Sequence, residues 1–511
     1  MTLEELIGQR LVLGIEGSQV TPETVELFRK TRAGGLIVFE RNFESPERLR
    51  RLISDLEQIL GRQLLVMVDH EGGRVIRFRE GVTIFPDAQA AGVCGDVDLV
   101  RRQGEKEAEE LRSLGIDLNL APALDVLGLS WNPAIGTRSY GHDPQGVAAM
   151  GRARIKGMQS KGLSACAKHY PGLGEAELDP HFELPVIRKN WKAMRQTHLL
   201  PFLKAFEENV EGVMSSHVIY PELESDSRRP ATFSRRIIHD SLRLEFGFTG
   251  VILSDDLKMD AIAKKVPLRE AAPLTVKAGH DLLLICSDAQ AQQEVFDGLL
   301  GAHKKKDLKI SELESSVERI LHLKEKHQPR LLKDFSSSKE DGKELARLLA
   351  SRGAKILRDG GGLLPISPAW CVKHSVSVLF PDLSSIVRER FIETELLEGR
   401  DFIRRTFSQF GVPAPNFQMI SVDPDEKERS KIKAMAQEQD LAFFFCWDAH
   451  LFGGTRQLLE ELQGTAKCLV VILLREPRDL EWLRLEFACV TGYGSRICQI
   501  EAALRKIFLP R

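Results

Sequence analysis

Eight short apolar runs alternate with helix-length amphipathic stretches along the first 326 residues, and this order constrains the fold more than any other feature. Strands that alternate with helices in this way are typical of βαβ units, whose strands run parallel. The runs lie at 11–15, 35–39, 64–68, 116–120, 164–167, 212–215, 250–254 and 281–285, with helices at 22–31, 46–60, 97–114, 145–161, 191–208 and 235–245. Eight such units predict an α/β protein that begins with a (β/α)8 barrel of the TIM type.

A second α/β part is expected after a polar linker. Residues 333–342, KDFSSSKEDG, are rich in serine and charge, as segments that connect domains often are. A helix at 343–352 leads into a new alternation, with strands at 376–380, 442–446, 468–473 and 488–490 and helices at 424–437, 456–462 and 497–507. The expected division is a barrel domain at 1–332, a linker at 333–342 and a smaller α/β sandwich domain at 343–511.

The composition disfavours several classes of partner. Lys and Arg number 71 against 73 Asp and Glu, a formal net charge of -2, so no strong field gathers nucleic acid or anionic lipid. No apolar run is long enough to span a membrane, and the N-terminus lacks a basic segment followed by a long apolar one. We expect a cytoplasmic protein with a small or neutral partner, provided that residue 1 is the true start.

Ionisable and polar residues stand at or just past the ends of several predicted strands. The carboxyl ends of barrel strands meet at one rim, where barrel enzymes carry their catalytic groups. One such residue is more often a turn former or a cap, but several on one rim favour an active site. The residues are Asp69, Lys168, His169, Ser216, His217 and Asp255.

The segment 168–185, KHYPGLGEAELDPHFELP, places Asp179 and His181 two residues apart in a loop after the fifth strand. A carboxylate in this position can hold one imidazole nitrogen and leave the other for proton transfer. An imidazole with a pKa of about 6.5 can both give and accept a proton near neutrality. An alternative of equal weight is that Asp179 caps a turn and His181 only decorates the loop.

A metal site is the less favoured interpretation of the same histidines. His169, His181 and His217 are able to supply imidazole ligands. The first strand, however, ends in Gly14-Ile15-Glu16 and lacks the His-x-His that metal-dependent barrel hydrolases commonly carry there. We therefore expect neither a metal nor another cofactor.

Two adjacent acids, Asp255 and Asp256, end the seventh strand in the segment 250–260, GVILSDDLKMD. A carboxylate that faces the barrel axis at a strand end can attack an anomeric carbon and form a covalent glycosyl-enzyme. Asp256 is interpreted either as a helix cap or as part of the site, because two adjacent acids are rarely both catalytic.

Two further segments offer groups that can bind a sugar. In 66–77, VMVDHEGGRVIR, Asp69 can accept hydrogen bonds from hydroxyls, and Arg74 and Arg77 are planar donors. In 132–141, NPAIGTRSYG, a loop after the fourth strand presents Arg138. Structural ion pairs are an equally weighted explanation for both.

Five motifs, VDHEGGRVIR, NPAIGTRSYG, KHYPGLGEAELDPH, VMSSHVIYP and SDDLKM, occur in this order and together resemble glycoside hydrolase family 3, in its β-N-acetylglucosaminidase branch. The similarity covers residues 1–326, and the segment 346–365 is similar to the start of the family's C-terminal sandwich. The resemblance implies a nucleophile, Asp255, an acid/base, His181, and its partner, Asp179. It also implies sugar binding by Asp69, Arg77, Arg138, Lys168 and His169.

The activity implied by this resemblance is retaining hydrolysis of N-acetylglucosaminides from short, peptidoglycan-derived glycans, without a cofactor. A β-glucosidase or β-xylosidase of the same family and a catalytically silent sugar-binding protein are the alternatives. The loop departs from the family pattern at Leu173 and Glu175, which replace the His and Asp of the common GHGD version, and at Pro180. Since the spacing to Asp179 and His181 is unchanged, the dyad is expected to be retained.

Overall fold

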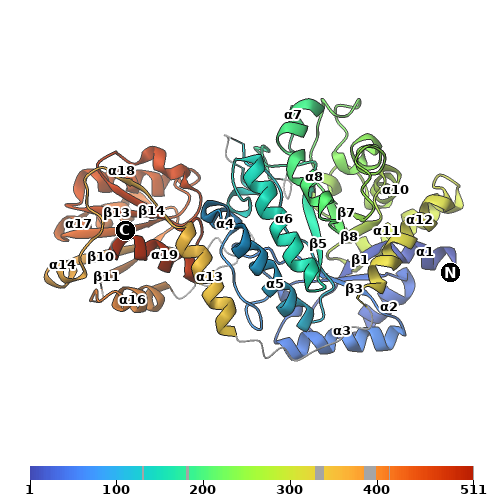
Figure 1. The fold of residues 1–511 in the computed structure, drawn as a ribbon, viewed down its shortest axis with the longest axis horizontal. Helices are drawn as coiled ribbons and strands as arrows, with labels where there is room; N and C mark the ends of the chain where they lie inside the picture. The colour runs from blue at the N-terminus through green and yellow to red at the C-terminus, as the bar shows by residue number, and fades with distance from the viewer. Residues whose placement is uncertain (129–131, 180–182, 328–338, 385–398, 414, 510–511) are drawn as a thin grey trace. The chain divides into compact units, whose positions relative to one another are not determined.

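The computed structural model describes residues 1–511 except 129–131, 180–182, 328–338, 385–398, 414 and 510–511 (Figure 1). Contacts between residues divide the chain into two compact units. The first contains Met1–Glu71, Ile76–Thr83 and Val97–Gly342, and the second contains Gly72–Val75, Ile84–Asp96 and Lys343–Arg511. Within the described residues, no helix combines the length and the apolar character that crossing a membrane requires.

The first unit contains a closed barrel of eight parallel strands in the order β1 to β8. The ring closes where β8 pairs with β1, with Leu283 opposite Leu11. The strands are β1 (Leu11–Gly14), β2 (Gly35–Val38), β3 (Leu65–Val68), β4 (Leu118–Asn119), β5 (Ser164–Tyr170), β6 (Gly212–Ser215), β7 (Val251–Asp256) and β8 (Leu282–Ile285). The predicted fold class is confirmed.

Local signals set the ends of the helices around the barrel. Helix α3 begins after Ser45, whose hydroxyl accepts the N–H of Arg48 at 3.3 Å, and ends before Gly61, whose φ is 66°. The helices of this unit are α1 (Leu3–Gln9), α2 (Pro22–Thr31), α3 (Pro46–Leu60), α5 (Val97–Ser113), α6 (Pro144–Ser160), α7 (Trp191–Gln196), α8 (Leu199–Glu207), α9 (Asp260–Ala263), α10 (Leu268–Ala278), α11 (Ala289–Lys304) and α12 (Ile310–Glu325).

Two expected helices differ from the structure. The helix expected at 191–208 is divided into α7 and α8, because Pro201 has no N–H to donate to the carbonyl of Thr197 and continue one helix. The helix expected at 235–245 is a π-helix over Arg236–Glu245. A hydrophobic pattern does not distinguish a π-helix from an α-helix, so the π form could not be predicted from the sequence.

The second unit is a three-layer α/β sandwich. Its six strands follow the order β11-β10-β12-β13-β14-β9, with β9 antiparallel at one edge. Alternate residues of the central strand β12 enter two cores. One is lined by α17 (Glu426–Glu438) and α18 (Gly453–Thr465), and the other by α16 (Gly399–Gln409) and α19 (Ile497–Phe508). The strands are β9 (Lys355–Asp359), β10 (Val376–Asp382), β11 (Asn416–Ser421), β12 (Leu441–Cys446), β13 (Leu469–Leu473) and β14 (Ala488–Thr491).

Strands β9 and β11 were missed by the sequence analysis. Both lie at edges of the sheet and expose part of their side chains, so neither forms a continuous apolar run. The helices of this unit are α4 (Ala88–Cys94), α13 (Lys339–Gly353), α14 (Pro368–Lys373), α16 (Gly399–Gln409), α17 (Glu426–Glu438), α18 (Gly453–Thr465) and α19 (Ile497–Phe508).

The two units are not separated by one boundary in the sequence. Two segments from the N-terminal third, 72–75 and 84–96, belong to the second unit. There Arg496 Nε donates to the carbonyl of Gly73 at 2.5 Å. Helix α13 begins at Lys339, so the last four residues of the expected linker are helical. The expected limits at 332 and 343 stay a prediction, because residues 328–338 lie outside the described part.

Candidate active site

Glu71 and Lys168 form the centre of a buried charge network at the carboxyl end of the barrel strands. Lys168 Nζ lies 2.5 Å from Asp69 Oδ1 and 2.6 Å from Glu71 Oε1. Arg138 binds Glu71 through two parallel hydrogen bonds of 2.6 and 2.8 Å. Arg77, 3.6 Å from Asp69, lies at the outer side of the network. A sugar that binds here meets fixed donors and acceptors instead of mobile side chains.

The charges of this network stabilise one another. Burial by itself raises the pKa of Glu71, but the charges of Arg138 and Lys168 and their hydrogen bonds hold that pKa well below its usual value. Burial lowers the pKa of Lys168, yet Asp69 and Glu71 shift it above its usual value. The carboxylate and the ammonium therefore both stay charged near neutrality.

His169 is held in one orientation by a buried carboxylate. Its Nδ1 lies 2.8 Å from Asp125 Oδ2, and Asp125 also accepts the backbone N–H of Leu173 at 2.8 Å. Burial raises the pKa of Asp125, but His169 and the hydrogen bonds bring it below its usual value. Because Nδ1 donates to Asp125, the neutral ring presents an acceptor at Nε2, which lies 3.5 Å from Arg138 Nη2.

The two adjacent acids of β7 have different surroundings. The Asp256 carboxylate accepts the backbone N–H groups of Lys258 at 3.0 Å and Cys286 at 3.3 Å. Burial raises the pKa of Asp256 above its usual value. The Asp255 carboxylate accepts the backbone N–H of Asp256 at 2.8 Å. Asp256 thus caps the strand end, which supports Asp255 as the nucleophile of the pair.

The loop after β5 is described only in part. His181 and Pro180 lie outside the described residues, so the geometry of the Asp179–His181 dyad stays a prediction. At the base of the loop Lys189 Nζ lies 2.8 Å from Glu175 Oε1. The ring of His198, 3.6 Å from Glu175, and Lys189 lower the pKa of Glu175 to about 2. Glu175, one of the departures from the family pattern, thus joins the two stems of the loop.

Two of the three histidines considered as metal ligands, His217 and His169, bind other groups, and the third, His181, lies outside the described residues. His217 Nδ1 lies 2.6 Å from the Thr232 hydroxyl, and its Nε2 lies 3.0 Å from the carbonyl of Asp256. The Nδ1 of His169 is bonded to Asp125. Across the described residues, no group of three His, Cys, Asp or Glu side chains has the geometry to hold a metal ion.

The network brings together all five of the predicted sugar-binding residues, Asp69, Arg77, Arg138, Lys168 and His169. Two of their partners, Glu71 and Asp125, were not predicted from the sequence. Glu71 stands two residues after Asp69 in the same motif, and Asp125 follows β4, so their positions near strand ends were the available signals. Their burial, 6% and 0% exposed, depends on partners far away in the chain. Arg74, also considered, belongs to the second unit.

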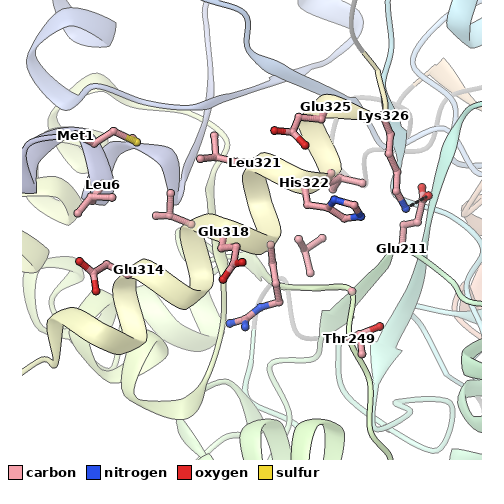
Figure 2. A pocket seen from close by; sticks show the side chains of 15 residues that line it. Met1, Leu6, Glu211, Thr249, Glu314, Glu318, Leu321, His322, Glu325 and Lys326 are labelled. Atoms are coloured by element: carbon pink, nitrogen blue, oxygen red, sulfur yellow. Dashed lines mark hydrogen bonds and ion pairs between the residues drawn. The ribbon is translucent and has the colours of Figure 1, made fainter.

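A cavity of about 770 Å³ lies at the opposite, amino-terminal end of the barrel strands (Figure 2). Helix α12 forms one side of it, and the residues just before β6 and β7 form another. Figure 2 shows Glu211 and Lys326 paired at its edge, 2.9 Å apart. Because barrel enzymes place their chemistry at the carboxyl ends of the strands, this position does not support a catalytic role.

The closed barrel and the charge network at its carboxyl rim define a barrel enzyme whose site lies at the carboxyl ends of the strands. The sequence profile of the Glycosyl hydrolase family 3 N terminal domain matches residues 2–323. The chain belongs to glycoside hydrolase family 3.

Similar proteins agree with this assignment. A beta-hexosaminidase of Hydrogenovibrio crunogenus is 34% identical over 339 residues, which cover 61% of this chain and 93% of that protein. One of Alkalilimnicola ehrlichii is 36% identical over 309 residues, with coverages of 59% and 88%. The solved structure of a glycoside hydrolase family 3 beta-N-acetylglucosaminidase from Paenibacillus sp. str. FPU-7 covers 99% of this chain and 96% of its own, with a TM-score of 0.91 and 29% identity.

Proposed function

We propose that the chain is a retaining β-N-acetylhexosaminidase, which removes terminal N-acetylglucosamine from short glycans. The observation that supports this proposal is the network of Asp69, Lys168, Glu71 and Arg138 at the barrel rim. Asp255 belongs to the carboxyl end of β7, at the same rim. The names of the similar proteins favour an N-acetylhexosaminide over a glucoside or a xyloside as substrate.

In the first step, a carboxylate oxygen of Asp255 bonds to the anomeric carbon while the bond from that carbon to the leaving oxygen breaks. His181 gives its proton to the leaving oxygen, and Asp179 holds the imidazole in the required tautomer. Water then attacks the anomeric carbon and gives a proton to the imidazole, while the bond from that carbon to the Asp255 oxygen breaks and frees the carboxylate. Two displacements at one carbon retain its configuration.

The charge network binds the sugar during both steps. The Asp69 carboxylate accepts hydrogen bonds from hydroxyls, and Lys168 and Arg138 donate to ring or hydroxyl oxygens. Glu71 holds Arg138, and Asp125 holds His169, before the sugar binds. Sugar binding therefore costs little side-chain entropy at these residues. The peptidoglycan-derived substrate and the cytoplasmic location are the finer parts of the proposal, and they rest on the resemblance of the motifs.

The test compares turnover of nitrophenyl N-acetylglucosaminide with that of nitrophenyl glucoside and follows the first-formed product by NMR. We expect turnover of the first substrate and a β-configured product. A 5-fluoro glycosyl donor should label the peptide that contains Asp255. Asp255→Ala should abolish turnover, and Asp256→Asn should keep most of it. A product of inverted configuration, with no labelled peptide, would contradict the retaining mechanism.

A further inference from the structure

Strand β7 does not pair regularly with β8 at the position of Asp255. Leu253 pairs with Leu282 and Asp256 pairs with Leu284, so two residues of β7, 254 and 255, lie opposite one residue of β8. A bulge of this kind bends the strand and re-aims the side chain that it carries. The direction of the Asp255 carboxylate therefore depends on what holds the bulge.

The neighbouring strand β8 holds one side of the bulge. The N–H of Leu284 donates to the hydroxyl of Ser254 at 3.2 Å, in place of a regular ladder carbonyl. The N–H of Cys286 donates to the Asp256 carboxylate at 3.3 Å. These bonds tie the residues before and after Asp255 to β8.

His217, which follows β6, holds the other side of the bulge. Its Nε2 lies 3.0 Å from the carbonyl oxygen of Asp256, and the N–H of Met259 donates to the same oxygen at 3.0 Å. A carbonyl only accepts, so Nε2 carries the hydrogen and the Nδ1 of the neutral ring is an acceptor. Thr232 supplies the matching donor: its hydroxyl lies 2.6 Å from Nδ1, closer than the 3.2 Å to the Ser216 carbonyl, which is the other acceptor within reach of its single hydrogen. Both side chains are fully buried.

We propose that His217 is a positioning residue for the nucleophile: it fixes the carbonyl of Asp256 and thereby the bulge that directs Asp255. Thr232 fixes the tautomer of His217. The inference rests on the proposed role of Asp255. An attacking oxygen must lie in line with the bond that breaks, and a displacement of about 1 Å can reduce a rate by about 100-fold.

The experiment uses His217→Asn and His217→Gln in the full chain. The amide nitrogen of glutamine reaches about as far as Nε2 of histidine, whereas that of asparagine reaches only the position of Nδ1. We expect Asn to lower kcat for nitrophenyl N-acetylglucosaminide, and the rate of labelling of Asp255 by a 5-fluoro donor, about 100-fold. KM should change little, and Gln should restore most of both rates. A variant with unchanged kcat, or with raised KM at full kcat, would overturn the proposal.

A second pair of variants keeps the test decisive if a His217 variant does not fold. Thr232→Val removes the hydroxyl that fixes the tautomer, and Thr275→Val removes an equally buried hydroxyl that bonds the Ala271 carbonyl of its own helix at 2.8 Å. We expect only Thr232→Val to slow labelling, with the two variants similar in thermal stability. Equal labelling rates would overturn the proposal. Absence of label on Asp255 of the unmodified enzyme would instead contradict the proposed function.

Discussion

Glu71 is the residue on which the sugar-binding network converges, although the resemblance assigns it no role. It is buried, and it neutralises two cations, Arg138 and Lys168, that are buried with it. Removing one member of a buried ion group leaves the others without compensation, which costs more than the group contributes when it is complete.

Glu71→Gln should therefore destabilise the protein by about 3 kcal/mol at pH 7 and raise KM more than it lowers kcat. The folded-state pKa of Glu71 is depressed, so its contribution to stability is present above the unfolded value of about 4.3 and is lost as pH falls below it. Urea unfolding from pH 7 down to pH 3 measures this. A stability difference between variant and unmodified protein that stays constant over that range would show that the charge is not responsible.

The proposed role of His181 as general acid predicts that the effect of removing it depends on the leaving group. His181→Ala should slow glycosylation steeply for natural disaccharides and much less for dinitrophenyl glycosides, which depart without a proton. Deglycosylation should then limit the rate, and azide should restore turnover and yield a β-glycosyl azide. Asp179→Ala should give a milder form of the same pattern. Steady-state rates over a series of aryl glycosides test this, and one uniform loss without azide rescue would exclude proton transfer by His181.

At the scale of elements, the stems of the loop after β5 are joined by the pair Glu175 and Lys189. The pair is partly exposed, since 30% of the Glu175 side chain is accessible. Water and salt therefore screen it, and its contribution to stability is on the order of 1 kcal/mol. The buried ring of His198, whose Nε2 lies 3.6 Å from Glu175 Oε1, is a second partner of the Glu175 carboxylate.

Glu175→Gln should lower the free energy of unfolding by about 1 kcal/mol at pH 7. The pKa of Glu175 is about 2 in the folded protein, against about 4.3 when unfolded, so the difference should shrink as pH falls from 5 towards 2. Glu207→Gln is the control, because its pair with Lys204 is about half exposed. An equal effect of the two substitutions at pH 7 would show that the Glu175 pair adds nothing particular.

Across the whole molecule, one chain encodes two compact units of different construction, and neither is contiguous in sequence. The turn 72–75 and the segment 84–96 stand within the barrel half but belong to the second unit. Gly73 has a φ of 52°, and a Cβ there would lie 2.4 Å from Asp87 Cγ. Only glycine fits this position without a shift of its neighbours.

Gly73→Ala should consequently destabilise the second unit, by more than about 2 kcal/mol, because it adds a steric overlap to the strain of a positive φ. Gly95→Ala in the same unit is the matched control: its φ is 70° but nothing lies within 4 Å of the added carbon, so about 1 kcal/mol is expected. Urea unfolding followed by the fluorescence of the buried Trp447 measures both. Equal losses would show that the overlap relaxes without cost.

The barrel and the order of the motifs along it could be predicted from the sequence alone, because the periodicity of a strand or an amphipathic helix is a property of neighbouring residues. It also placed Asp69, Lys168 and His169 at strand ends, which a closed barrel must bring to one rim. The edge strands β9 and β11 were not predicted, since partly exposed strands lack a continuous apolar run.

The tertiary structure alone decided how the site is held. Glu71 meets Arg138 across 67 positions of the chain, and Asp125 meets His169 across 44, so no local pattern encodes either pair. The bulge in β7 depends on the register with β8 and on His217, and it separates the surroundings of Asp255 from those of Asp256. Such contacts form only when the barrel closes, because burial and distant partners, not sequence neighbours, set the hydrogen bonds and the pKa of each carboxylate.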